Sequence, residues 1–395
     1  MIISEFTFQK TPKIFFGSKS LNYLTTILKE KKVDNALMIT GHNSLKRSGK
    51  LDIITSLIKE SNAKPCWIKT VEEPTVDFID AIVKEFRNKN FDVIISIGGG
   101  SSIDTGKAIS AMLLCNDSII NYLDGVGTKK HDGRKIPFIA IPTTAGTGSE
   151  ATNNAVIRKK GVDGFKRSLR HNNFIPDFAI VDPELTLTQP KDVSTFAGLD
   201  ALTQLIEAFV STKASAMTDA LNYSGLKDFY DNLVKVCTND PNNINARSCL
   251  SYGALISGIT LTNAGLGIVH GFASEIGGPY NISHGVICGS LLLAATKANI
   301  DTLKSDTNKN LYYLKKYATI GQLINMDKTM PTYIDSCNYL VDKLSELSEI
   351  LKIPKLSTFG ISEDAIPEIV KRVGQKNNPV KLTNLALENI LKLSL

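Results

Sequence analysis

The stretch "FDVIISIGGGSSIDTGKAIS" (91–110) decides the fold class of this chain. It begins with a short apolar run of strand length, turns through Gly98, Gly99 and Gly100, and continues with helical spacing. Glycines allow positive φ and close approach to the backbone, and the first N–H groups of the following helix attract an anion. A plain strand–helix turn usually needs one glycine, so three in a row predict a phosphate-binding loop.

The segments around this loop alternate between strand and helix. Strand-like runs lie at 35–41, 64–72, 136–142 and 177–184, and helical spacing is found at 44–59 and 76–88. A hairpin-like stretch precedes the last strand. Short apolar strands that alternate with helices are typical of a parallel sheet covered on both faces. Residues 1–184 are therefore predicted to form an α/β dinucleotide-binding domain with a Rossmann-like parallel sheet.

The strand signal nearly disappears after residue 184. Long segments that begin near residues 194, 214, 246 and 330 carry apolar residues every three or four positions. This pattern predicts an all-α helical-bundle domain over residues 185–395.

The composition is that of an ordinary globular protein. Of its 395 residues 43% are hydrophobic and 21% charged, and the net charge of +6 comes from lysines spread along the chain, which disfavours a nucleic-acid groove. Six cysteines without a CxxC pair indicate free thiols in a reducing compartment. We see no signal peptide and no apolar stretch near the ~18 residues of a membrane span. A cytoplasmic protein without nucleic-acid or membrane partners is expected.

The glycine loop matches neither of two common nucleotide fingerprints. A GxGxxG motif that starts at Gly98 would need glycine at Ile103, and a Walker A motif would need Ser or Thr at Ala108. A second loop, "IPTTAGTGSEAT" (141–152), follows another predicted strand and is rich in hydroxyl groups. Ligands of such sheets bind beyond the carboxyl ends of the strands, so the two loops together favour a dinucleotide.

Two of the five histidines, His270 and His284, lie 14 residues apart in the glycine-rich stretch "VHGFASEIGGPYNISHG" (269–285). One interpretation is that they are ordinary core or helix-cap residues. The other is that the two imidazoles converge on one bound group that nitrogen atoms coordinate.

Several long motifs, in order, resemble those of the iron-containing alcohol dehydrogenases. They are GGGSxxDxxK (98–107), PTTAGTGSE (142–150), VDPEL (181–185), DALTxxIEAF (200–209) and VHGxA…HG (269–285). The resemblance implies a dinucleotide-binding domain, a helical metal domain and a divalent metal, Fe²⁺ or Zn²⁺. The family's metal ligands are an aspartate, a histidine four residues later and two histidines 14 apart. These positions are Asp200, Gln204, His270 and His284 in this chain.

This chain departs from the family pattern at two positions. Gln204 replaces a ligand histidine, and Ser274 replaces a histidine that usually lies near nicotinamide and substrate. Asp200 and Gln204 are still spaced i, i+4 and share a helix face, and a carboxylate with two imidazoles suits Zn²⁺ or Fe²⁺. We expect Asp200, His270, His284 and Ser274 to be catalytic, with Gln204 as a weak ligand or a supporting group.

The expected cofactor contacts follow from the same motifs. The phosphates should meet the backbone from Gly98 to Ser102, with threonine hydroxyls nearby. The full set of expected cofactor-binding residues is Gly41, Ser44, Gly98, Gly99, Gly100, Ser101, Ser102, Asp104, Lys107, Thr143, Thr144, Thr147, Ser149 and Leu185.

The choice of nicotinamide cofactor depends on the end of the strand at 35–41. NAD-specific relatives carry an acidic residue there, which binds the ribose hydroxyls and repels a 2′-phosphate. This chain has Gly41 in that position, followed by Ser44, Lys46 and Arg47. The alternative is a polar turn in which Ser44 only caps a helix. The sequence thus favours NADP over NAD.

The activity that the resemblance implies is the reversible oxidation of a small alcohol to an aldehyde or ketone by a homodimer. Two alternatives stay open at this point: a lyase of the dehydroquinate synthase kind on the same fold, and a metal-poor nucleotide-binding protein without catalysis. The sequence does not name the substrate.

Overall fold

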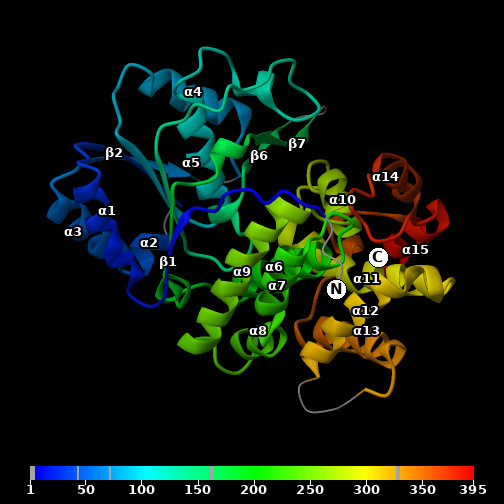
Figure 1. The fold of residues 1–395 in the computed structure, drawn as a ribbon. Coiled ribbons are helices and arrows are strands. Elements are labelled where there is room, and N and C mark those ends of the chain that lie inside the picture. The colour runs from blue at the N-terminus through cyan, green and yellow to red at the C-terminus, as the bar shows by residue number, and fades with distance from the viewer. Residues whose placement is uncertain (1–4, 42–43, 71–72, 161–163, 326–329) are drawn as a thin grey trace. The chain divides into compact units, whose positions relative to one another are not determined.

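The computed structural model describes residues 5–41, 44–70, 73–160, 164–325 and 330–395 (Figure 1). These residues form two compact units, one of Gln9–Pro190 and one of Lys191–Leu395 with the N-terminal residues 5–8. The division falls where helix α6 (Lys191–Phe209) begins, whereas the sequence prediction set it after residue 184.

The first unit is built on a six-stranded parallel sheet in the order β1-β8-β5-β4-β2-β3. Its strands are β1 (Lys13–Phe16), β2 (Asn35–Gly41), β3 (Lys64–Thr70), β4 (Val93–Gly98), β5 (Phe138–Pro142) and β8 (Phe178–Val181). The predicted Rossmann-like α/β domain is confirmed.

Helices cover both faces of this sheet because alternate strand residues point to opposite sides. On β2, Leu37 and Ile39 join a core with α4 (Val76–Phe86) and α5 (Gly100–Met112). Met38 joins a second core with α1 (Tyr23–Glu30) and α3 (Lys50–Ser61). The inner strands β2, β4 and β5 are therefore buried on both faces, as their apolar sequence indicated.

The strand order contains a topological switch point between β2 and β4. The chain passes from β2 outward to β3 and then returns to the other side of β2 to form β4. Connections leave the sheet in opposite directions at such a point, which opens a crevice at the carboxyl ends of the two strands. Gly41 ends β2 and Gly98 ends β4.

Three local features differ from the sequence prediction. The edge strand β1 was not predicted. The helix expected over 44–59 is interrupted between α2 (Ser44–Arg47) and α3, since Gly49 adopts a left-handed φ of 69°. The last strand ends at Val181, and Pro183–Thr186 form a 3₁₀ turn instead. The expected hairpin is present as β6 (Asn154–Lys159) and β7 (Phe165–Arg170).

The second unit is helical, and its described residues contain no strand, which confirms the predicted all-α domain. Its further helices are α7 (Ala216–Leu226), α8 (Phe229–Cys237), α9 (Ile244–Ala264), α10 (Ile268–Ile276), α11 (His284–Lys304), α12 (Thr307–Ile324), α13 (Tyr333–Ile350), α14 (Ile366–Arg372) and α15 (Asn384–Ser394). Its 3₁₀ helices are Leu356–Phe359 and Glu363–Ala365, and those of the α/β unit not yet named are Ser20–Asn22, Ile119–Tyr122, Ser149–Ala151 and Asn172–Phe174.

Helix α11 lies at the centre of this unit and packs against α6, α12, α13 and α15. It is long and apolar enough to cross a membrane by length and composition, and the bent pair α9–α10 passes the same test. The sequence analysis did not anticipate this. The window in α11 is 67% buried inside the unit, as in the core helix of a bundle.

Candidate metal centre and nucleotide loops

Three helices of the helical unit bring an acid and two imidazoles together. Asp200 lies on α6, His270 on α10, and His284 is the first residue of α11. Asp200 Oδ1 is 3.5 Å from Nε2 of His270 and 3.5 Å from Nε2 of His284. The two histidines predicted to converge do so, with ring centroids 5.1 Å apart.

A second carboxylate fixes the orientation of His270. Glu207 Oε2 lies 2.7 Å from His270 Nδ1, and the Glu207 carboxylate also accepts hydrogen bonds from the backbone N–H groups of Gly267 and Val269. Because a carboxylate only accepts, Nδ1 carries a proton and donates it to Glu207. Nε2 is therefore the ring nitrogen on the side of Asp200, and it offers a lone pair there when the ring is neutral. Carboxylate–histidine pairs of this kind orient metal-binding imidazoles.

Gln204 supports Asp200 in this structure. Its Oε1 accepts a hydrogen bond of 2.8 Å from Ser257 Oγ, and its side chain also hydrogen-bonds Asp200. Since the Asp200 carboxylate is an acceptor, the amide N–H₂ of Gln204 is the donor. The structure thus places the Gln204 side chain beside Asp200 with its oxygen turned to Ser257.

The charged groups of this cluster change one another's pKa. Burial raises the pKa of Asp200, but the two imidazoles outweigh it and hold the pKa below its usual range. Burial lowers the pKa of His270, yet Cys288, Asp200 and Glu207 reverse this and raise it well above the usual value. Burial also lowers the pKa of His284, and Cys288 and Asp200 reverse this and raise it.

Asp200 carries the observation that tests whether a metal fits. Its Oδ1 is buried and has no hydrogen-bond partner among the described residues, although two imidazole nitrogens lie near it. Leaving a buried charged oxygen unsatisfied is costly, and a bound cation would remove that cost. A carboxylate and two imidazoles are donors that Zn²⁺ and Fe²⁺ prefer, so the residues fit a divalent metal.

Ser274 lies one helical turn after His270 on α10. Its Oγ donates a hydrogen bond of 2.8 Å to the His270 carbonyl and lies 3.1 Å from Lys376 Nζ. Lys376 also donates to the His270 carbonyl at 3.0 Å. A hydroxyl and an ammonium group therefore stand together at the position where the family pattern led us to expect a histidine.

The glycine loop in the α/β unit is packed against the threonine loop. A Cβ on Gly100 would lie 2.6 Å from Thr147 Cγ2, and one on Gly99 would lie 3.3 Å from Thr144 Cγ2. None of the three loop glycines has a positive φ, so of the two properties that glycine allows, the loop uses close approach. The missing side chains let the glycine loop pack closely against the threonine loop. The N–H groups of the first residues of α5 come before the first hydrogen bonds within the helix, so no carbonyl of the helix accepts from them.

Gly41 and the glycine loop lie side by side at the switch point. A Cβ on Gly98 would be 3.5 Å from the backbone nitrogen of Gly41, and Gly98 O accepts a hydrogen bond from Thr143 N. The Ser44 side chain lies outside the described residues. The Ser102 hydroxyl is 3.0 Å from Thr70 Oγ1, and Ser101 O accepts a bond from Thr105.

Lys107 and Asp104 of the glycine-loop helix are bonded inside the α/β unit. Lys107 Nζ donates to the carbonyls of Ser149, Thr152 and Asn154 at 2.7–3.0 Å. Asp104 accepts from Ser149 Oγ and from a backbone N–H of β6. The buried Leu185 packs in the core beneath the sheet. The direct cofactor contacts expected of these residues stay predictions, since their side chains hold the 149–154 segment or the core.

Comparison with known proteins agrees with this geometry. The model of the iron-containing alcohol dehydrogenases matches residues 11–183, and that of the C-terminal domain of the same family matches residues 194–395. The chain belongs to the iron-containing alcohol dehydrogenase family. Members of this family are oxidoreductases, so a nicotinamide cofactor, a divalent metal and a small alcohol or aldehyde substrate follow.

Similar proteins are found across almost the whole length of the chain. The NADPH-dependent butanol dehydrogenase of Clostridium saccharobutylicum is 31% identical over 366 residues, 92% of this chain and 89% of that protein. The NAD-dependent methanol dehydrogenase of Bacillus methanolicus is 29% identical over 387 residues, 96% and 97% of the two chains. The crystal structure of a 1,3-propanediol oxidoreductase has a TM-score of 0.88 at 26% identity and covers 99% of this chain and 100% of that one.

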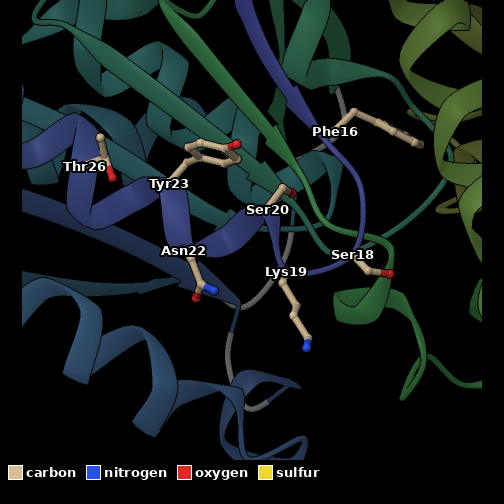
Figure 2. Close-up of a pocket in the computed structure, with 7 residues that line it drawn as sticks. All are labelled: Phe16, Ser18, Lys19, Ser20, Asn22, Tyr23 and Thr26. Carbon is tan, nitrogen blue, oxygen red and sulfur yellow. The ribbon is translucent and has the colours of Figure 1, made fainter.

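The α/β unit of this alcohol dehydrogenase also has a surface depression of about 430 Å³ between β1 and α1 (Figure 2). Its lining is Phe16, Ser18, Lys19, Ser20, Asn22, Tyr23 and Thr26. None of these is a residue of the glycine or threonine loops or of the metal centre.

Sequence analysis of this alcohol dehydrogenase missed two members of the metal centre. Glu207 is seven residues after Asp200 on α6, two helical turns along the same face, which was a readable signal. Cys288 is four residues after His284 on α11, and its Sγ lies 3.7 Å from His270 Nε2. One ligand atom each from Asp200, His270, His284 and Cys288 lie within 4.8 Å of one another.

Proposed function

We propose that this chain is a metal-dependent alcohol dehydrogenase that interconverts small alcohols and aldehydes and prefers NADP(H). The observation that carries this proposal is the buried, unpartnered Oδ1 of Asp200 facing His270 and His284. A divalent ion bound there would supply Lewis acidity toward the substrate oxygen. Asp200, His270 and His284 would hold the ion, and Glu207 would keep the His270 lone pair in place.

Ser274 and Lys376 are proposed to move the hydroxyl proton of the substrate. Ser274 Oγ donates to the His270 carbonyl and accepts from the exposed Lys376 ammonium. Since neither partner takes up a proton, Ser274 would pass its own hydroxyl proton to solvent water as it accepts the proton of the substrate. A hydroxyl can accept and donate a proton at the same oxygen. This pair would replace the histidine that relatives carry at position 274.

The α/β unit is proposed to bind the dinucleotide through its glycine loop. Backbone N–H groups at the start of α5 would meet the phosphates, with the hydroxyls of Thr144 and Thr147 beside them. The absence of a Cβ at Gly99 and Gly100 would allow a phosphate to approach the backbone.

The preference for NADP(H) rests on Gly41. It ends β2 at the switch point and presents no carboxylate to a 2′-phosphate, and the exposed Lys46 follows on α2. The names of the relatives include both an NADPH-dependent and an NAD-dependent enzyme. The cofactor therefore has to be decided on this chain's own residues.

The test is cofactor oxidation by the purified protein with a panel of short aldehydes. NADPH turnover that is lost on chelation and restored by Zn²⁺ or Fe²⁺ is expected, with NADPH favoured over NADH at least about tenfold in kcat/KM, or about 1.4 kcal/mol. Gly41→Asp should reverse that ratio by charge repulsion. Full activity in protein that elemental analysis finds metal-free would overturn the metal dependence. A tenfold preference for NADH would overturn only the cofactor assignment. A homodimer and a cytoplasmic location stay predictions.

A further inference from the structure

Cys288 places a thiol against the three metal-binding groups. It is completely buried on α11, and its spacing of four residues from His284 puts both side chains on one helix face. Its Sγ lies 3.7 Å from His270 Nε2 and within 4.8 Å of the ligand atoms of Asp200 and His284. The four groups come from three helices of one unit.

The separations match those of a tetrahedral site. Metal bonds of about 2.0 Å to oxygen and nitrogen and about 2.3 Å to sulfur put an O–N pair about 3.3 Å and an S–N pair about 3.6 Å apart. The structure has 3.5 Å for both oxygen–nitrogen pairs and 3.7 Å for the sulfur–nitrogen pair. These three separations link four donor atoms, one each from Asp200, His270, His284 and Cys288, and all four lie within 4.8 Å of one another. One ion can therefore reach them with small adjustments.

Other buried cysteines of this unit have ordinary surroundings. The Cys337 thiol donates to the carbonyl of Leu314, and burial raises its pKa to about 11. Burial also raises the pKa of Cys237, which hydrogen-bonds Thr195. A buried cysteine alone is unremarkable as a core residue. Cys288 differs because its Sγ lies 3.7 Å from His270 Nε2 and within 4.8 Å of ligand atoms of Asp200 and His284.

We propose that the Cys288 thiolate is the fourth protein ligand of the metal, which gives an Asp200–His270–His284–Cys288 centre. The proposal rests on the proposed function of the same site. Cys288 thus supplies the donor that the family's histidine would supply at position 204, and Gln204 is released to support Asp200 through its bond to Ser257. Metal binding displaces the thiol proton to solvent as the metal–sulfur bond forms. A thiolate donor favours Zn²⁺ over harder ions such as Mn²⁺.

The first experiment measures the metal's neighbours in the wild-type protein. X-ray absorption at the zinc edge of the Zn²⁺-loaded enzyme should show one sulfur at about 2.3 Å beside nitrogen and oxygen at about 2.0–2.1 Å. A first shell of nitrogen and oxygen alone would overturn the proposal. This measurement depends on no variant and no turnover, so it remains decisive if a substitution prevents folding.

The second experiment compares Cys288→Ser with the matched control Cys337→Ser, which removes a buried thiol of the same unit away from the cluster. Cobalt-loaded wild type and Cys337→Ser should show the near-ultraviolet thiolate-to-cobalt band, and Cys288→Ser should lose it. Zn²⁺ affinity should fall at least about tenfold in Cys288→Ser only. Equal affinity, or a band that persists, would overturn the proposal. Wild type that turns over alcohol with bound cobalt but lacks the band would overturn Cys288 as a ligand and leave the proposed function standing. Protein that binds no divalent ion would overturn both.

Discussion

Each unit of this enzyme buries a cluster of charged groups, and the two clusters are satisfied differently. In the α/β unit, Lys107 donates to the carbonyls of Ser149, Thr152 and Asn154, so its charge has partners within the chain. In the helical unit, Asp200 Oδ1 faces His270 and His284 without a hydrogen bond. A buried charge is tolerated only when it is paired or coordinated. The first cluster is complete within the chain, and the second is the one that we propose a metal ion completes.

The largest expected effect tests the incomplete cluster. His270→Ala and His284→Ala each remove an imidazole that no neighbour replaces, and each should lower metal-dependent turnover more than about 100-fold, beyond the loss typical of an outer-sphere partner. NADPH affinity should change little, because the glycine loop belongs to the other unit. Metal content by elemental analysis and NADPH binding by fluorescence titration check both halves. Normal metal content with normal turnover would show that the two histidines do not hold the metal.

Lys107→Met tests the complete cluster. It leaves the half-buried Asp104 and the buried Glu150 without their cation and the carbonyls of 149–154 without a donor, which should cost about 3–5 kcal/mol of stability. Trp67 on β3 is the single tryptophan of the chain, so its fluorescence follows urea unfolding of the α/β unit. The metal content of the folded protein should be unchanged. A loss under about 1 kcal/mol would show that the cluster is not structural.

Glu150→Gln tests the cluster of the α/β unit through the pH dependence of its stability. Burial raises the pKa of Glu150 to about 7 from an ordinary value near 4.5, so the folded protein holds this proton more tightly than the unfolded chain does. The stability of the α/β unit should therefore fall as pH rises from about 4.5 to about 7, by up to about 3 kcal/mol at 1.4 kcal/mol per unit. Glu150→Gln should remove that part of the slope.

The measurement for Glu150→Gln is the difference in Trp67-monitored urea midpoints between variant and wild type at several pH values. The variant should gain on wild type as the pH rises to 7 and then stay level. A difference that does not vary with pH would rule out the raised pKa of Glu150 as the cause.

The smallest expected effect is that of changing Glu207, the carboxylate that holds His270. Glu207→Gln keeps the size of the side chain but replaces an acceptor-only carboxylate with an amide, which weakens its hold on the His270 Nδ1 proton. Metal affinity should fall about 10- to 100-fold, as for other partners of ligand histidines. Glu275→Gln, an acid on α10 outside the cluster, is the control. An unchanged Zn²⁺ affinity in Glu207→Gln would show that Glu207 only caps α10.

Sequence patterns were reliable where the signal is local. The strand at 35–41 and the helix starting after Gly99 follow from apolar periodicity and the glycine turn, and both are present. Local patterns failed at β1, a short edge strand whose side chains are mostly exposed, and at Gly49, where a left-handed residue divides an apparently continuous helix. Periodicity carries no information about either feature.

The sequence by itself determined the two-part architecture and the glycine and threonine loops, because contiguous motifs carry them. The family resemblance of its motifs implied the grouping of Asp200 with His270 and His284. Only the tertiary structure decided that Cys288 joins these residues, that Glu207 orients His270, and that Lys107 turns into its own unit. Each depends on helices or loops far apart in the chain meeting in space. Side-chain direction there is fixed by packing between elements, which no spacing along one segment encodes.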